Sequence, residues 1–212
     1  MGRRKTKMCN LYKLSRTQDE VAQFFDGLSE NLTVAPAGNA PEQMYPGYPG
    51  MVMDGERLRQ MAWGFPLERT GAKGQPLKPK PVNNARSDKL TSPFWSASFR
   101  ERRCLIPVSA WAEAEGQRGS MTRTWLSARD TPLMAIAGLW RETDEWGPAY
   151  SMIMTDAAPP MRAIHHRMPV ILAPSDWQTF LHAPVGQAHA LCRPWPGDLA
   201  IERTDKPWFS KG

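Results

Sequence analysis

The middle of the chain is a succession of short strand-like runs, and this feature limits the available folds more than any other. The runs cover residues 104–113, 121–128, 133–140 and 150–155. Residues 129–132 read Arg-Asp-Thr-Pro and provide a turn between the second and third runs. Short strands that follow one another this closely predict antiparallel sheets or a barrel. Alternation of apolar and polar residues predicts a further strand at residues 57–63.

Proline and glycine interrupt the chain on either side of that further strand. Residues 31–50 contain Pro36, Pro41, Pro46 and Pro49 with three glycines, which excludes a long helix and favours extended backbone with turns. Residues 66–82 run through Gly, Lys and Pro with almost no apolar content. We therefore expect a long connection without regular structure there, and such connections are usually functional or mobile.

Helices are predicted near the two ends. A capping box at residues 17–20 precedes Val21, Phe24 and Phe25, whose spacing is that of an amphipathic helix closed by Gly27. A second capping box at residues 175–178 and a short helix at 185–192 are expected near the C-terminus. With no internal repeat and no change of composition, these patterns predict a single α+β domain.

Composition excludes several classes of protein. The 212 residues are 41% hydrophobic and 23% charged, which is enough for one sizeable core. No apolar run approaches the roughly 20 residues of a membrane helix, and no apolar stretch follows the basic residues at the start. We expect a cytoplasmic protein without a membrane partner.

Charge and cysteine content limit the kinds of binding site that the chain can carry. Four of the six net positive charges lie in the first seven residues, so any phosphate-binding surface elsewhere must be a local patch. Cys9, Cys104 and Cys192 are widely spaced and form neither a disulfide framework nor a metal knuckle. Adjacent His165 and His166 point apart in a strand, so we assign no metal and no cofactor.

Four local features could carry chemistry, and each has a plain structural alternative. Cys9 follows Met8, and a chain that began at Met8 would lose this methionine and expose Cys9 with a free α-amine. Glu113 ends an apolar strand, where a carboxylate is costly unless it is paired or faces water. His165 could titrate near neutral pH or be a satisfied structural residue. The triplet 84–86, Asn-Ala-Arg, could bind phosphate or be an ordinary loop.

Together and in this order, the features resemble the SRAP family, the SOS-response-associated peptidase-like proteins. The resemblance spans nearly the whole chain and is carried by Met-Cys-Asn-Leu-Tyr at 8–12, Tyr-Pro-Gly at 45–47, Trp-Gly at 63–64, Asn-Ala-Arg at 84–86, Arg-Cys-Leu-Ile-Pro at 103–107, Glu113, Ala-Gly-Leu-Trp at 137–140, Thr155 and Ile-His-x-Arg-Met-Pro at 164–169. A proline loop of the family is matched either by residues 33–36 or by residues 43–46, and we favour the second.

The resemblance implies a fold and a function. The fold would be a single α+β domain with curled antiparallel or mixed sheets, barrel-like, a few flanking helices and a positively charged groove. The function would be to shield abasic sites in single-stranded DNA by a covalent thiazolidine crosslink through an N-terminal cysteine. The protein would be a monomer, associated with the nucleoid when bound to DNA.

The resemblance also implies roles for individual residues. Cys9 would be the nucleophile, His165 would promote opening of the sugar ring, Glu113 would handle protons, and Asn84 would hold the terminus. Contacts to DNA would come from Arg86, Trp63, Pro46 and Thr155, although a core position is an equal alternative for Trp63. Lys73, Lys78 and Lys80 would add phosphate contacts that weaken with salt.

The crosslink requires Cys9 to be the first residue, whereas the sequence begins with eight further residues. We expect residues 1–8 to be a basic extension that is not translated or is removed, for example by autoproteolysis, and residues 9–212 to be the domain. Two alternatives stay open. One is a cysteine peptidase or amidase that uses Cys9, His165 and Glu113. The other is a module that binds single-stranded DNA without a covalent bond.

Overall fold

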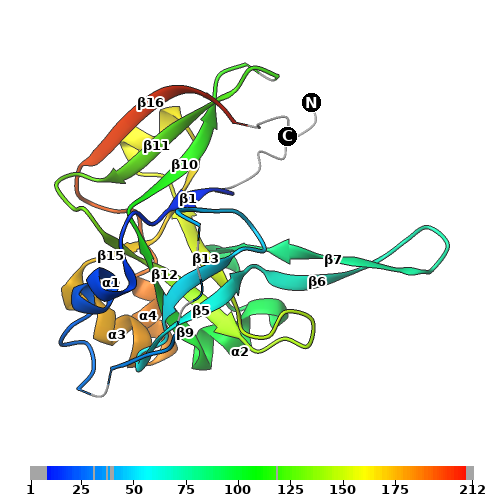
Figure 1. The fold of residues 1–212 in the computed structure, drawn as a ribbon, viewed down its shortest axis with the longest axis horizontal. Helices are drawn as coiled ribbons and strands as arrows, with labels where there is room; N and C mark the ends of the chain where they lie inside the picture. Colours follow the sequence, from blue (N-terminus) through cyan, green and yellow to red (C-terminus); the bar gives the residue numbers. More distant parts are fainter. Residues whose placement is uncertain (1–8, 31, 37, 39–40, 118, 209–212) are drawn as a thin grey trace.

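The computed structural model describes residues 9–30, 32–36, 38, 41–117 and 119–208 (Figure 1). The strands are β1 (Tyr12–Lys13), β2 (Thr33–Val34), β3 (Gln43–Met44), β4 (Pro49–Met53), β5 (Arg57–Trp63), β6 (Phe65–Thr70), β7 (Pro76–Val82), β8 (Asn84–Arg86), β9 (Arg103–Val108), β10 (Ala110–Glu115), β11 (Thr122–Ala128), β12 (Met134–Arg141), β13 (Ala149–Asp156), β14 (Arg167–Pro169), β15 (Ile171–Leu172) and β16 (Leu199–Pro207). The helices are α1 (Gln18–Phe24), α2 (Pro93–Glu101), α3 (Trp177–His182) and α4 (Val185–Ala190), with 3-10 turns η1 (Ser87–Lys89), η2 (Pro159–Ala163) and η3 (Pro174–Asp176).

The centre of the molecule is a closed five-stranded barrel. Strands β13, β12, β9, β4 and β5 pair in this order through antiparallel ladders, and β5 returns to β13 through a parallel pairing. Closure removes the free edges of these strands. Their inward residues form the main apolar core, and at Gly138 a Cβ would lie 2.8 Å from the Cys104 sulfur. The predicted barrel-like α+β domain is confirmed.

A second sheet lies against one end of the barrel, in the order β16-β11-β10-β1-β3 (Figure 1). Helices α1, α3 and α4 gather on one side of the molecule, and α2 lies below the barrel. The contact between α1 and α3 is aromatic, with the Phe24 and Phe25 rings 5.0 and 5.2 Å from Trp177. Among the described residues, no helix is long and apolar enough to cross a membrane.

Several sequence predictions are confirmed. The strand at residues 57–63 is β5, and the runs at 121–128, 133–140 and 150–155 are β11, β12 and β13 within a residue or two. The helix after Thr17 is α1, and its capping box forms as predicted, with Thr17 accepting from the Glu20 amide. The run at 104–113 is divided at Ser109 into β9 and β10, which belong to different sheets.

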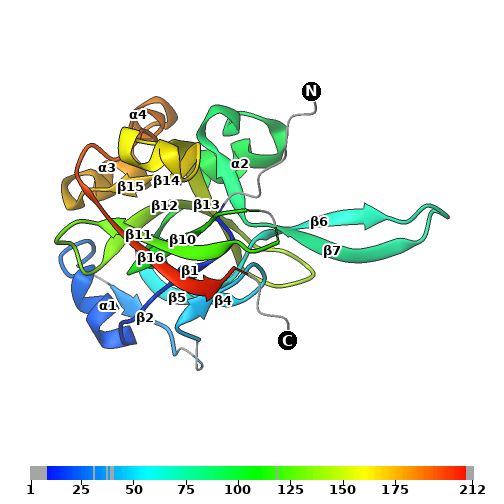
Figure 2. The ribbon, with the colours of Figure 1, turned by 90° about the horizontal axis from the view of Figure 1, so that it is seen from above.

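Other predictions were wrong. Residues 66–82 are not an irregular connection, because Phe65–Thr70 and Pro76–Val82 pair as a hairpin that projects from the body (Figures 1 and 2). The capping box at 175–178 does not form, since Pro174–Asp176 is a 3-10 turn and Asp176 makes no side-chain cap. Helices were predicted near the C-terminus, but strand β16 follows α4 and pairs with the edge of β11. Helix α2 was missed, although Ser92-Pro93 is a typical helix start.

Candidate functional site

The carbonyl of Cys9 is held in place by two side-chain amides. Asn84 donates to it from 2.7 Å and Asn83 from 3.0 Å, and Asn83 also donates to the side chain of Asn10 from 3.2 Å. The thiol faces the Leu11 carbonyl at 3.5 Å and is fully buried. Cys9 is therefore fixed through its backbone just before β1.

Strand β13 carries two of the site's elements on its two edges. On one edge, β8 runs parallel to β13 and pairs Asn84 with Met152 and Arg86 with Met154. On the other edge, β14 runs antiparallel and pairs Arg167 with Asp156. Asn84 and His165, the residue two before Arg167, are thus brought to the same region although 81 residues separate them in sequence.

Glu113 reaches the site from the second sheet. Its strand β10 pairs with β1, and the Ala112 amide donates to the Leu11 carbonyl at 2.9 Å. The side chain is 2% exposed, and burial raises the pKa of the Glu113 carboxyl well above its usual range. A neutral carboxylic acid is therefore favoured in the folded protein.

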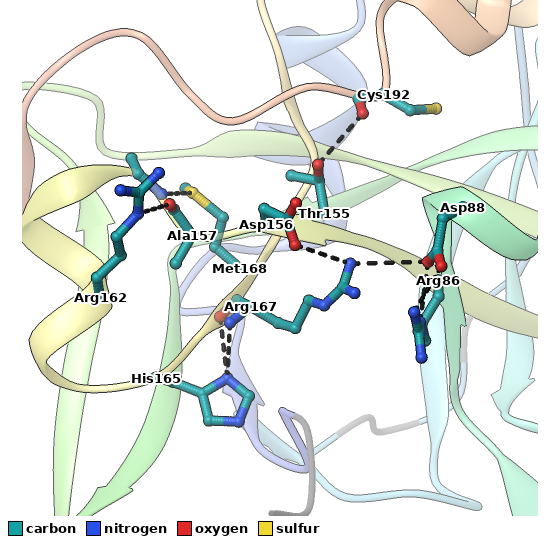
Figure 3. Close-up of polar contacts among 11 residues, drawn as sticks. Arg86, Asp88, Thr155, Asp156, Ala157, Arg162, His165, Arg167, Met168 and Cys192 are labelled. Carbon is teal, nitrogen blue, oxygen red and sulfur yellow. Dashed lines mark hydrogen bonds and ion pairs between the residues drawn. The ribbon is translucent and has the colours of Figure 1, made fainter.

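His165 lies next to this carboxyl. Its Nδ1 is 4.0 Å from Oε1 of Glu113, and burial lowers the pKa of the imidazole. The backbone of Arg167 presents both its amide, 3.2 Å away, and its carbonyl, 3.0 Å away, to Nδ1 (Figure 3). Either neutral tautomer is consequently supported, so Nε2 can act as a donor or as an acceptor.

Three site atoms are buried and have no partner in the described part of the chain. Seven buried side-chain nitrogen or oxygen atoms lack a hydrogen bond among the described residues, and three of these are Asn84 Oδ1, Glu113 Oε1 and His165 Nε2. Each such atom costs about 1–3 kcal/mol in a folded protein. Their concentration in residues from three separate strands and turns indicates a place for a polar ligand or reacting group.

Burial disfavours the thiolate form of Cys9. Burial, and then the neighbouring Glu113, raise the pKa of Cys9 well above its ordinary value, and the hydrogen bond to Leu11 opposes this only partly. Cysteine nucleophiles that act as thiolates have lowered pKa values and cationic neighbours. Burial therefore favours the neutral forms of both the Cys9 thiol and the Glu113 carboxyl.

A group of buried aromatic side chains supports the Cys9 anchor through Asn83. Trp63 is fully buried, packs edge to face on Tyr12 with ring centroids 4.9 Å apart, and donates from Nε1 to the Asn83 carbonyl at 3.0 Å. The hydroxyls of Tyr12 and Tyr150 bond to each other. They do so over Gly50, where a Cβ would lie 2.2 Å from the Tyr150 oxygen.

The residues expected to touch DNA fall into two groups. Trp63 occupies the core position that the sequence left open, so its ring has no surface on which a base could stack. Thr155 is 4% exposed and faces the Cys192 carbonyl at 3.3 Å, which leaves no surface for DNA (Figure 3). The expected direct contacts of these two residues therefore do not agree with their burial.

Pro46 and Arg86 have accessible surface. Pro46 is half-buried in the turn between β3 and β4, where the Gly47 amide donates to the Trp63 carbonyl at 2.7 Å. Arg86 is exposed and makes a two-pronged ion pair with Asp88, at 2.9 and 2.5 Å. The same aspartate lies 3.8 Å from Arg167, which also pairs with Asp156 at 3.2 Å (Figure 3).

Sequence reasoning missed Asn83 and the pairing of Arg167 with two aspartates. The signal for Asn83 was its position beside Asn84 in an Asn-Asn pair. Among the described residues, no three His, Cys, Asp or Glu side chains are grouped closely enough to hold a metal ion.

Comparisons with known proteins show which family the chain matches. The model of the SOS response associated peptidase (SRAP) family matches residues 8–206. The chain is 28% identical over 184 residues to the abasic site processing protein YoaM of Bacillus subtilis, a match that covers 78% of this chain and 75% of YoaM. It is 29% identical over 134 residues to the abasic site processing protein YoqW of the same organism, covering 59% of this chain and 58% of YoqW.

Solved structures show the same fold. A protein of Bordetella bronchiseptica superposes with a TM-score of 0.76 at 24% identity and covers 92% of this chain and 99% of its own. A protein of Bacteroides thetaiotaomicron superposes with a TM-score of 0.72 at 18% identity, covering 93% of each chain.

Proposed function

The chain belongs to the SOS response associated peptidase family, and from this premise we propose that it processes abasic sites in DNA by covalent attachment through Cys9. The observation that carries the proposal is a set of three polar atoms, on Asn84, Glu113 and His165, that have no hydrogen-bond partner among the described residues and belong to the site around the anchored Cys9. Two relatives named abasic site processing proteins support the choice of substrate.

The chemistry of an abasic site fits these groups. The sugar exists as a cyclic hemiacetal in equilibrium with an open-chain aldehyde. The α-amine of an N-terminal cysteine adds to the aldehyde carbon, water leaves, and an imine forms. The thiol then adds to the imine carbon while its proton passes to nitrogen. The product is a thiazolidine ring, with one C–N and one C–S bond formed and one water released.

His165 and Glu113 suit the proton transfers in this sequence. Opening the sugar needs a proton at the ring oxygen and removal of a proton from the hydroxyl at C1′. Nε2 of His165 has no partner among the described residues and can take or give a proton, since both tautomers find a partner at Nδ1. Burial raises the pKa of Glu113 and favours its protonated form, which can supply a further proton beside the thiol and the imidazole.

Asn83 and Asn84 fix the nucleophile. Their two hydrogen bonds hold Cys9 by its carbonyl, the group of this residue that takes no part in the reaction. Such positioning accelerates a reaction by removing the need to orient its partners. The proposal requires a chain whose first residue is Cys9, because an amide nitrogen cannot form the imine.

The geometry favours this function over a peptidase. A cysteine peptidase needs an activated thiolate and donors aimed at the carbonyl of the bond it cleaves. Here burial raises the pKa of the thiol, and the two asparagine amides are engaged with the carbonyl of Cys9 itself.

Single-stranded DNA is the proposed form of the substrate. The reacting carbon must reach a cysteine that is fully buried, so the damaged nucleotide has to leave any base stack, which costs least in an unpaired strand. Arg86 and Pro46, beside the site and accessible, are the proposed contacts to the flanking backbone.

The proposal is tested with a chain that starts at Cys9 and a single-stranded oligonucleotide that carries one abasic site. We expect an adduct of protein plus oligonucleotide less one water, stable to denaturation and heat. A matched oligonucleotide with a tetrahydrofuran in place of the abasic sugar lacks the aldehyde and should give none, and so should Cys9→Ala. Turnover of a peptide substrate without any DNA adduct would overturn the proposal in favour of a peptidase.

A further inference from the structure

The most exposed feature of the fold is the β6–β7 hairpin, which projects well beyond the barrel (Figures 1 and 2). Every described side chain from Leu67 to Thr70 and from Ala72 to Lys78 is exposed. A two-stranded hairpin without a packed face gains little stability by itself. The hairpin is nevertheless well formed, because the Gly71 amide donates to the Gln75 carbonyl at 2.8 Å and Gly74 adopts a φ of +79°.

The hairpin begins and ends at the Cys9 site. At its base, Phe65 packs on Trp95 with ring centroids 5.4 Å apart, and the Arg141 guanidinium lies 4.2 Å above the same ring. Gly64 crosses the other strand so closely that a Cβ would lie 2.5 Å from Pro81. The residue after Val82 is Asn83, which holds the Cys9 carbonyl. DNA bound at Cys9 therefore lies at the root of the hairpin.

Positive charge is concentrated on this element. Between Phe65 and Val82 there are four basic side chains and one acidic one, a net charge of +3. The first seven residues carry +4 of the chain's +6, so the rest of the chain, outside these two segments, sums to −1. The basic residues of the hairpin are Arg69, Lys73, Lys78 and Lys80.

The hairpin places cations beside exposed leucines. The register pairs Leu67 with Lys80 and Arg69 with Leu77, with a register shift between the two pairs, and the two residues of a pair in an antiparallel ladder point to the same face. Leu67 and Leu77 are 44% and 38% exposed. An alternation of cationic and apolar side chains matches a single strand of DNA, which offers phosphates and unpaired bases at short intervals.

The outer edge of β7 does not favour a protein partner that would add a strand there. Pro76, Pro79 and Pro81 lie on β7, and proline has no amide hydrogen to donate to a further strand. The face of the hairpin is therefore a better binding surface than the β7 edge.

We propose that the β6–β7 hairpin is a DNA-binding arm that holds the single strand leading away from the abasic site. Phosphates would contact the lysines and Arg69, and Leu67 and Leu77 would lie against bases. The proposal rests on the proposed function for the position of the damaged nucleotide. With about 3.3 Å per residue, the arm reaches on the order of 20 Å, a span of several nucleotides.

The test compares two charge-matched variants. One carries Lys73→Gln, Lys78→Gln and Lys80→Gln, and the control carries Arg16→Gln, Arg57→Gln and Arg129→Gln at three exposed cations outside the hairpin. Each is measured with abasic oligonucleotides that carry about 2 or about 10 nucleotides on each side, a difference set by the reach of the arm. Affinity for undamaged long strands is measured against salt concentration.

We expect the lysine variant to lose at least tenfold more affinity for the long strand than for the short one. Its slope of log K against log salt should fall in magnitude by about 2, since each lost phosphate contact removes about 0.7. The control variant should keep the slope of the parent. A second variant, with Leu67→Ser and Leu77→Ser, should weaken long-strand binding without changing the slope.

An equal loss of affinity for the long and the short oligonucleotides would overturn the proposal of a DNA-binding arm. So would an unchanged slope of log K against log salt. If the protein binds undamaged single strands with the predicted salt slopes but forms no covalent adduct with abasic strands, the proposed function is overturned and the DNA-binding role of the hairpin is kept. A parent protein that binds no DNA would overturn both.

Discussion

The Cys9 site and the β6–β7 hairpin meet at adjacent residues of the chain but differ in almost every physical property. The site is buried, burial shifts the pKa values of Glu113 and His165 toward their neutral forms, and three of its polar atoms lack hydrogen-bond partners among the described residues. The hairpin is exposed, strongly cationic and free of buried unpartnered polar atoms among those described. Covalent chemistry needs the first environment, whereas binding a long polyanion needs the second. Substitutions at the Cys9 site should therefore impair the covalent reaction, whereas substitutions in the hairpin should impair the binding of DNA.

The largest effect is expected at the thiol. Cys9→Ser keeps the α-amine but replaces sulfur by a weaker nucleophile, so the reaction should stop at the reversible imine. A Cys9→Ser chain that starts at this residue should give no heat-stable adduct, yet borohydride should trap it on the abasic strand. A heat-stable adduct formed at the parent's rate without borohydride would show that sulfur takes no part.

The next largest effect is expected at the buried acid. Glu113→Gln removes the proton that the pair with His165 can supply, and crosslinking should slow by about 10²–10⁴-fold. In the parent, the rate should fall as pH rises through the raised pKa of Glu113, because the acid loses its proton. A parental rate profile in the variant would contradict this role.

The same substitution should also change how the stability of the protein depends on pH. Because the folded pKa of Glu113 is raised, its contribution to the free energy of unfolding is greatest below the usual value of 4.5 and is lost as pH rises through the raised value. The amide of the Glu113→Gln variant has no charge to bury at high pH. The melting temperature of this variant relative to the parent should therefore increase from acidic to alkaline pH, and a constant difference would show that the carboxyl is not buried as a neutral acid.

A smaller effect is expected at the anchor of Cys9. Asn83→Ala removes one of the two hydrogen bonds to the Cys9 carbonyl and should destabilise the protein by about 0.5–1.5 kcal/mol. Crosslinking should slow about tenfold for a loss of about 1.4 kcal/mol in positioning. Denaturant unfolding and single-turnover kinetics measure the two effects separately, and a kinetic effect with no loss of stability would point to direct contact with DNA.

The smallest effect is expected at the exposed ion pair. Asp88→Asn frees Arg86 from its two-pronged partner, so binding of single-stranded DNA should tighten several-fold with a salt slope steeper by about 0.7. Fluorescence anisotropy at several salt concentrations measures both. Weaker binding would show that Asp88 orients Arg86 for phosphate.

The contrast between the two regions also explains what the sequence could predict. Apolar residues recur along β5, β12 and β13, and β11 has a short apolar segment between turn residues, so these four strands were predictable. The hairpin was not, because β7 has the prolines and lysines of a loop and owes its pairing to the ordered turn at Gly71–Gln75. The closing β13–β5 pairing joins residues about 90 apart in sequence, which no local pattern encodes.

The candidate site was partly predictable for a related reason. Cys9, Asn84, Glu113 and His165 were selected by order and by resemblance, whereas their convergence depends on the two edges of β13 and on the second sheet. Trp63 carries no local signal that separates a core ring from a stacking ring. Only its burial and its bond to Asn83 identify it as a support for the Cys9 anchor.

The most direct measurement locates the crosslink on the protein. Abasic sites also form imines with lysines, and the β6–β7 hairpin carries three of them. The adduct is digested, treated with a thiol-alkylating reagent and mapped by tandem mass spectrometry. We expect the sugar to lie on the peptide beginning at Cys9 and this thiol no longer to alkylate. Attachment to Lys73, Lys78 or Lys80, or a Cys9 adduct whose thiol still alkylates, would contradict covalent capture by the aminothiol of Cys9.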